Sequence, residues 1–120
     1  MSTQTRSMPV DPVTLEVLRG QLDSVAEEMQ LIILKSSHST IVSESLDATS
    51  AVFDRQGRTI AQAVAIPIHL GVLAELGRRF AAAYPDGVAQ PGDVYAINDP
   101  YAGGTHLPDF AVAAPVFFEQ

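Results

Sequence analysis

Apolar residues recur at helical spacing near the start of the chain. They occupy every third or fourth position through the first third of the sequence, which draws one stripe along a helix. Asp11 can cap the free N–H groups of the first turn, and Pro12 is tolerated at the first helical position. We therefore predict a long amphipathic helix from Asp11-Pro12 to about Lys35, preceded by a flexible leader at residues 1–10. The stripe consists of Leu15, Leu18, Leu22, Val25, Met29 and Ile32.

Beyond this helix the pattern changes toward strands. Residues 48–53 and 58–61 predict a β-hairpin, because the intervening Asp54-Arg55-Gln56-Gly57 has Asp at the start and Gly at the end of a turn. Leu73, Leu76 and Phe80 fall on one face of a second helix, which we expect from about Leu70 to Ala83.

The last third of the chain predicts short strands around an irregular loop. Residues 94–97 form a short apolar run, and residues 98–109 contain two prolines and two glycines. Residues 110–118 are apolar enough for a buried strand, although Pro115 interrupts it. The fold class is therefore α+β. Because this apolar run continues almost to the end of the sequence, we expect residues 11–120 to be an incomplete part of a larger domain.

Composition narrows the possible partners. The 120 residues carry a net charge of −7, which weighs against nucleic acid and against anionic membranes. A hydrophobic content of 47% excludes a disordered acidic tail. The chain has no cysteine, so a disulfide scaffold, a thiolate metal site and a Cys nucleophile are excluded. No apolar stretch reaches the roughly 18 residues of a membrane span, and we expect a soluble cytoplasmic protein.

The loop at residues 98–109 carries the strongest candidate chemistry. His106 and Asp109 offer a nitrogen and an oxygen ligand to a divalent ion such as zinc, iron or manganese. In a straight strand, however, positions three apart point to opposite faces, so the chain must bend for both to reach one ion. Gly103-Gly104 makes such a bend plausible. Two ligands are too few for a complete site, and an ordinary Pro/Gly loop is the competing interpretation.

Two further residues have both a structural and a functional interpretation. His69 lies between apolar residues just before the second predicted helix, which is typical of a buried or capping histidine. Asp47 interrupts a polar segment and by itself indicates a turn or a cap. Gly103-Gly104-Thr105 lacks the lysine and the spacing of a phosphate-binding loop, so the chain shows no nucleotide site of its own.

A series of motifs resembles the hydantoinase B/oxoprolinase family, which also includes the metal-bearing large subunits of acetone and acetophenone carboxylases. The resemblance runs from about residue 10 to residue 120, and the block from Asn98 to Asp109 is its most specific part. The other motifs are Asp11 to Val17, Leu46-Asp47, Ala51 to Asp54, Gly57-Arg58, Ala61-Gln62, Ile66 to Gly71 and Pro91 to Val94.

The resemblance implies an ATP-dependent reaction shared between two proteins. A hydantoinase A-type partner binds ATP and phosphorylates the carbonyl oxygen of a lactam, hydantoin or ketone. The B-type subunit then uses a metal site for attack by water, or by a CO₂ equivalent in the carboxylases. His106 and Asp109 match the family's metal ligands, and Asp47 matches an acidic position that we place in the same site. A further histidine ligand is expected downstream of Gln120.

The resemblance also suggests substrate-binding residues and leaves three functions open. His69 occupies a recurrent position of the family, and we take His69, Gly103 and Gly104 as candidates for substrate binding. The leading expectation is a subunit of a cyclic amide hydrolase within a hetero-oligomer. A ketone carboxylase subunit is the alternative chemistry. A non-catalytic assembly segment, whose helix stripe packs against a sister subunit, is the alternative of another class.

Overall fold

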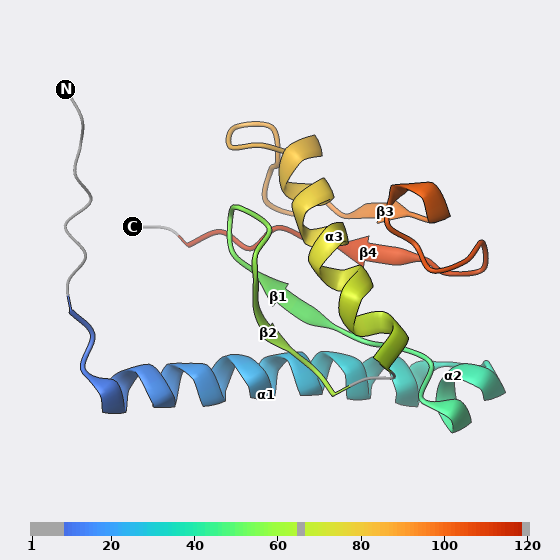
Figure 1. Cartoon of the computed structure of the whole chain (residues 1–120), viewed down its shortest axis with the longest axis horizontal. Coiled ribbons are helices and arrows are strands. Elements are labelled where there is room, and N and C mark those ends of the chain that lie inside the picture. The colour runs from blue at the N-terminus through green and yellow to red at the C-terminus, as the bar shows by residue number, and fades with distance from the viewer. Residues whose placement is uncertain (1–8, 65–66, 119–120) are drawn as a thin grey trace.

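In the described part of the chain, three α-helices and one short 3₁₀ helix combine with two small antiparallel sheets, which is an α+β fold. The computed structural model describes residues 9–64 and 67–118, so most of the expected leader lies outside the described residues. Within these two ranges no helix is both long and apolar enough to cross a membrane. The elements in order are α1 (Pro12–Ser36), α2 (Thr40–Ser45), β1 (Ala51–Phe53), β2 (Thr59–Gln62), α3 (Pro67–Ala83), β3 (Tyr95–Ile97), the 3₁₀ helix η1 (Pro100–Ala102) and β4 (Ala111–Ala113) (Figure 1).

Helix α1 begins where the sequence predicted. The Asp11 carboxylate accepts hydrogen bonds from the backbone N–H groups of Val13 and Thr14 at 3.1 and 3.0 Å, which satisfies two otherwise free donors. The helix buries a different side from the predicted stripe, because the hairpin packs on Ala26 and Gln30. Leu22 is partly buried beside Ala26. The other stripe residues are 42–59% exposed: Leu15, Leu18, Val25, Met29 and Ile32.

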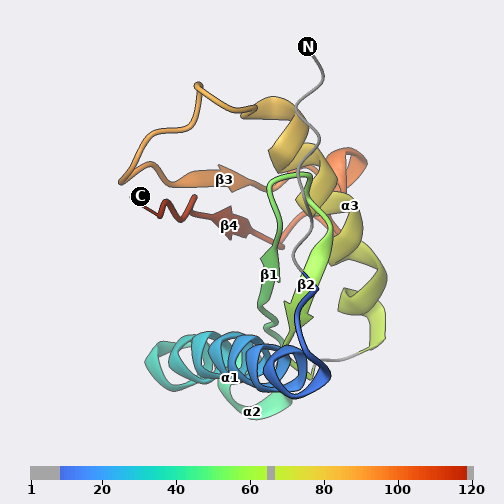
Figure 2. The same cartoon turned by 90° about the vertical axis from the view of Figure 1, so that its left-hand side faces the viewer.

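The predicted hairpin is present and stands on α1 (Figure 2). Its turn closes at the predicted place, because the Gly57 N–H donates to the Asp54 carbonyl at 2.9 Å. Two side chains join α1 to the segment that enters β1. Gln30 Nε2 donates to the Ala48 carbonyl at 2.8 Å, and Ser50 Oγ donates to the Ala26 carbonyl at 2.5 Å. Buried polar groups at this contact are thereby paired.

Helix α3 packs beside the hairpin turn and begins earlier than predicted, at Pro67. Proline suits the first turn of a helix, so the extension is physically reasonable. The backbones of Gly57 and Gly77 come so close that a Cβ on Gly77 would lie 2.5 Å from the Gly57 carbonyl oxygen. Gly57 also has a φ of +76°, which favours glycine. Two glycines therefore allow the turn to rest directly on α3.

The end of the chain departs from the sequence prediction. Strand β4 covers only Ala111–Ala113 and pairs with β3, where Tyr95 lies opposite Ala113 and Ile97 opposite Ala111. The expected buried strand over residues 110–118 is wrong, since Val116 is 96% exposed in this chain. Pro115 cannot donate a ladder hydrogen bond, and β3 is too short to pair further.

Helix α2 and η1 were not predicted, because each is a single short segment held by its caps. Ser39 Oγ accepts from the Val42 N–H at the start of α2, and Asp99 Oδ1 accepts from the Tyr101 N–H at the start of η1. Such short elements carry no hydrophobic period that a sequence pattern could reveal.

The buried core is small for the size of the chain. The buried apolar residues of the described ranges are Ala26, Ala61, Ala63 and Leu76. The accessible surface is 9319 Å², whereas a compact protein of this mass exposes about 6,300 Å². The radius of gyration is 16.0 Å, against about 14 Å for a compact chain of this length. Few apolar side chains of the described ranges are therefore fully buried.

Candidate metal centre

The loop between β3 and β4 owes its shape to caps and glycines. Asp99 caps η1 from one end, and Gly103 ends it with a φ of +103°, a backbone conformation that favours glycine. The N–H groups of Ala102 and Gly104 both donate to the Asp99 carbonyl, at 3.0 and 3.3 Å. The chain is therefore folded back on itself immediately before Thr105 and His106.

A four-residue turn then brings His106 and Asp109 together. The Asp109 N–H donates to the His106 carbonyl at 3.0 Å, and the side chains meet with His106 Nδ1 3.0 Å from Asp109 Oδ2. The bend that the sequence required is thus present, and the opposite-face arrangement of a straight strand does not occur. His106 is 56% exposed and Asp109 28% exposed, so the pair faces solvent with the carboxylate more sheltered.

The geometry of this pair fits two donors on one ion. The 3.0 Å separation between His106 Nδ1 and Asp109 Oδ2 is that of a direct contact between the two side chains, and it brings a nitrogen and an oxygen donor to one place. A neutral imidazole and a carboxylate also suit iron or manganese. The described residues nevertheless contain no group of three His, Asp or Glu side chains that could hold a metal ion. The pair therefore offers two donor atoms, fewer than a complete metal site needs.

Asp47 makes a different contact. It follows α2, and its Oδ1 lies 2.9 Å from Nε2 of His69 in the first turn of α3. Asp47 therefore joins His69 and does not complete a cluster with His106 and Asp109. Nothing in the sequence indicated this contact. Asp47 and His69 lie 22 positions apart, and no motif links them.

The two glycines of the loop have packing roles. A Cβ on Gly103 would lie 3.3 Å from Glu75 Cγ of α3, and a Cβ on Gly104 would lie 3.1 Å from Pro100 Cα. Arg79 of α3 holds the same loop, because its guanidinium donates to the Tyr101 carbonyl at 3.4 Å. The glycines thus permit close packing of the loop on α3 and on itself. Substrate binding by Gly103 and Gly104 stays a prediction.

Two buried hydroxyl groups lie beside the candidate residues in sequence. Thr49 Oγ1, two positions after Asp47, and Thr105 Oγ1, next to His106, are both buried without a hydrogen-bond partner among the described residues. Most buried polar atoms in proteins are paired, so each exception needs an explanation. Gln62 Nε2 on β2 is a third such atom, so unpaired buried polar atoms are not confined to the candidate residues.

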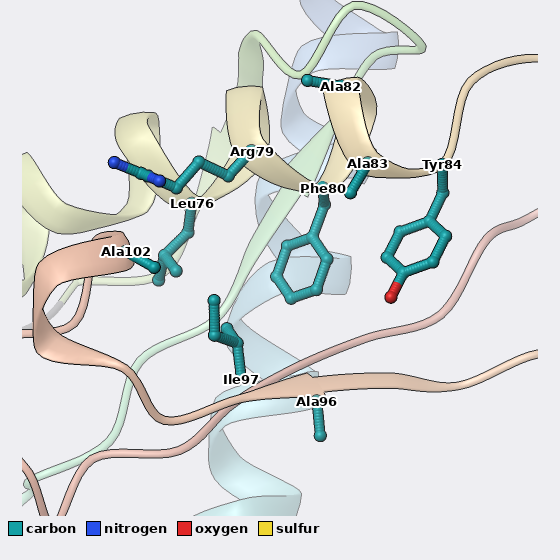
Figure 3. Close-up of a pocket in the computed structure, with 9 residues that line it drawn as sticks. All are labelled: Leu76, Arg79, Phe80, Ala82, Ala83, Tyr84, Ala96, Ile97 and Ala102. Atoms are coloured by element: carbon teal, nitrogen blue, oxygen red, sulfur yellow. The ribbon is translucent and has the colours of Figure 1, made fainter.

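An open apolar groove of about 480 Å³ lies between α3 and the β3–η1 segment (Figure 3). Leu76, Phe80 and Ile97 face one another across it, and Arg79 lies at its edge. The groove contains none of His69, His106, Asp47 and Asp109. The candidate chemistry therefore lies outside the groove, and the predicted apolar face of the second helix forms one of its walls.

Comparison with known proteins identifies the chain. Residues 11–120 match the family model described as hydantoinase B/oxoprolinase. The chain belongs to this family. The match covers nearly the whole sequence and includes Asp47, His69, His106 and Asp109, so the resemblance found in the motifs is confirmed.

Relatives of this hydantoinase B-family chain carry names of cyclic amide hydrolases. A 5-oxoprolinase of Pestalotiopsis fici is 39% identical over 90% of this chain and 8% of its own length. A 5-oxoprolinase of Saccharomyces cerevisiae is 36% identical over 98% of this chain and 9% of its own length. The caprolactamase subunit beta of Pseudomonas jessenii is 39% identical over 92% of this chain and 19% of its own length. The chain thus spans a fifth or less of these curated relatives.

Proposed function

We propose that the chain is part of the metal-bearing B-type subunit of an ATP-dependent cyclic amide hydrolase. Its substrates are 5-oxoproline, hydantoins or lactams, phosphorylated beforehand by an A-type partner in a hetero-oligomer. Family membership and the relatives named 5-oxoprolinase and caprolactamase support the reaction class. The observation that carries the proposal is the 3.0 Å contact between His106 and Asp109.

The residues of the chain have a defined part in this reaction. His106 offers a neutral nitrogen lone pair, and the ionised carboxylate of Asp109 neutralises part of the charge of a bound cation. Asp47, which contacts His69 in this structure, is the proposed third ligand, and a histidine downstream of Gln120 is the proposed fourth. A zinc, iron or manganese ion held there supplies Lewis acidity and makes water nucleophilic at neutral pH. ATP binds to the partner, since Gly103-Gly104-Thr105 lacks the phosphate-loop lysine.

The substrate class is tested by coupled turnover. The intact protein that contains this chain is co-expressed with its A-type partner, and ATP consumption is followed with 5-oxoproline, hydantoin and caprolactam. We expect at least one of these to stimulate ATP hydrolysis and to be ring-opened. ATP consumption with acetone or acetophenone plus bicarbonate, and with none of the cyclic amides, would instead establish the carboxylase alternative.

The metal ligands are tested by substitution. His106→Ala and Asp109→Asn should each lower the bound metal, measured by inductively coupled plasma mass spectrometry, and lower turnover at least tenfold. His38→Ala is the matched control, since His38 is an exposed histidine between α1 and α2. Unchanged metal content in both ligand variants would contradict the proposed site.

An assembly role is the competing function, and one observation favours it. Leu18, Val25 and Ile32 on α1 are 46–59% exposed, so an apolar side of the helix is uncovered in this chain. Contiguous exposed apolar surface commonly marks an interaction site. An intact protein without bound metal, whose activity survives His106→Ala, would establish this role in place of the hydrolase.

A further inference from the structure

The sheet formed by β3 and β4 is apolar on both of its faces. Ala96 lies opposite Val112 in the register, whereas Ile97 lies opposite Ala111. Successive residues of a strand point to opposite faces of a sheet, so these two pairs lie on different faces. Figure 3 shows Ile97 directed toward α3 and Ala96 directed away from it. One face of the sheet therefore packs on α3, and we call the opposite one the outer face.

The outer face consists of four apolar side chains. Ala96 and Val112 form its centre, and Val94 and Phe110 continue the same alternation just outside the two strands. Val94 and Val112 are each 66% exposed, Phe110 is 71% exposed, and Ala96 is exposed as well. An antiparallel sheet that faces water on one side normally carries polar residues at its outward positions. Here the outward positions are apolar, which is typical of a sheet that lies between two layers.

The sheet is also too small to be stable by itself. Each strand is three residues long, and in the described part of the chain β3 and β4 pair only with each other. A two-stranded sheet is marginally stable in water unless further strands or a packed layer support it. Packing on α3 supports one face, so the outer face is where further support is missing.

The size and charge of the outer face indicate what can cover it. Its four side chains together expose on the order of 400 Å², whereas a stable interface between separate proteins buries about 800 Å² on each side. Association of separate molecules also loses translational and rotational freedom, which a segment of the same polypeptide does not lose. None of the four side chains is charged, so the face offers no ion pair to an incoming protein.

We infer that another apolar segment of the same polypeptide covers the outer face in the intact protein, and that this face is not an interface with the A-type partner or with a second copy. The chain spans a fifth or less of the relatives named above, so proteins of their length can supply such a segment. The inference rests on one part of the proposed function, namely that the chain is part of a longer B-type subunit. It depends on neither the metal site nor the substrate.

Cysteine labelling of the intact protein tests this inference. Val112→Cys is compared with Val88→Cys, because Val88 is 55% exposed in the turn between α3 and β3. The intact protein, purified without its A-type partner, is labelled with a maleimide under native conditions and in urea, and mass spectrometry identifies the labelled peptides. We expect Val112→Cys to react at least about tenfold more slowly than Val88→Cys in the native protein, and equally fast in urea. Equal native rates would overturn the inference.

Protein concentration and the A-type partner identify what covers the face. The slow reaction of Val112→Cys should be independent of protein concentration and should not require the A-type partner. Protection that appears only at high concentration would assign the face to contact between two copies. Protection that appears only after addition of the A-type partner would assign the face to that partner. Either result contradicts cover by the same polypeptide.

A second measurement uses a charge on the same face. Val112→Lys should lower the unfolding temperature of the intact protein by several degrees, because a covered face cannot solvate an unpaired ammonium group. Val88→Lys is the matched control and should change the unfolding temperature little. Equal, small shifts in both variants would show that the outer face stays open to water.

The two proposals fail separately. His106→Ala with unchanged bound metal contradicts the proposed metal site and leaves the covered face standing. Fast native labelling of Val112→Cys, with metal loss in His106→Ala, contradicts the covered face and leaves the proposed function standing.

Discussion

The pKa of Tyr95 depends on the groups around its side chain. Its ring stacks on Tyr84 with centroids 3.5 Å apart, and its hydroxyl donates to Asp93 at 2.7 Å. Burial, followed by this hydrogen bond, raises the pKa of Tyr95 to about 12. The same bond lowers the pKa of Asp93. The residues between α3 and β3 are thus tied together by a neutral phenol and an ionised carboxylate.

We predict that Asp93→Asn lowers the pKa of Tyr95 but leaves it above 10.0. The hydrogen bond to a carboxylate disappears, while burial, the larger cause, remains. Carbon NMR of the labelled tyrosine ring during alkaline titration measures the change. Tyr84→Phe keeps the stacked ring and removes only the smallest cause, the Tyr84 hydroxyl, so it should lower the Tyr95 pKa less than Asp93→Asn does. A Tyr95 pKa that stays at about 12 in Asp93→Asn would show that burial alone sets it.

Asp11 gives a prediction about pH. Hydrogen bonds from the Thr14 hydroxyl and backbone lower the pKa of Asp11 below its ordinary value of 3.8. The unfolded chain therefore binds this proton more tightly than the folded chain, so the contribution of the cap to stability is present above pH 3.8 and is lost as the pH falls below it.

Asp11→Ala should accordingly lower the helix content or the unfolding free energy near neutral pH. In this variant the unfolding free energy should also lose the pH dependence that the Asp11 carboxyl contributes. Asp11→Asn should keep most of the cap, since Asn accepts the same bonds, but should also lose the acid dependence. Circular dichroism during urea denaturation at several pH values measures both. Equal acid dependence in all three proteins would contradict the assignment.

At the scale of elements, the contact between the hairpin turn and α3 depends on the absence of a side chain. Gly77 faces both the Gly57 carbonyl and the ring of Phe53. The sequence alone does not explain why glycine is needed at Gly57 and Gly77, because these two residues come into contact only when the hairpin has formed. Helix glycines are normally unfavourable by about 1 kcal/mol relative to alanine, so this one needs a packing reason.

We predict that Gly77→Ala destabilises the chain by about 1–3 kcal/mol, through a clash with backbone that cannot easily move. Gly71→Ala in the same helix should instead stabilise it by about 0.5–1 kcal/mol, because a Cβ there meets nothing within 4 Å. Denaturant unfolding of the two variants measures the difference. Stabilisation by both substitutions would mean that the turn does not rest on α3.

At the scale of the whole molecule, the core lies under the hairpin and leaves the apolar side of α1 open. Ala26 is fully buried, whereas Ile32 on the same helix is 59% exposed. Substitutions at these two positions should therefore differ in their effects on stability, although both are apolar positions of one helix. The difference also shows whether other protein covers α1.

We expect Ala26→Leu to lower the unfolding free energy by about 1–3 kcal/mol through overpacking. Ile32→Gln should change it by no more than about 0.5 kcal/mol in the isolated chain. Comparing the same two variants in the intact protein, by denaturant unfolding and by copurification with the proposed A-type partner, tests whether α1 is covered. A large cost of Ile32→Gln only in the intact protein would show that the open side of α1 is an interface.

Much of the fold follows from local pattern. The start of α1 at Asp11-Pro12, the turn at residues 54–57 and the presence of α3 each depend on neighbours in sequence, and each was predicted. The strand over residues 110–118 was predicted wrongly. Apolar residues favour burial, but their composition does not show whether another part of the chain packs over them. The buried side of α1 was missed for the same reason.

The candidate site divides in the same way. The sequence by itself determined which side chains carry nitrogen and oxygen donors, and the motifs around His106 and Asp109 indicated the family. Only the tertiary structure decided that a turn joins these two and that Asp47 meets His69 from 22 positions away. Donor chemistry is a property of the side chain, but the distance between two donors is set by every backbone angle and packed contact between them.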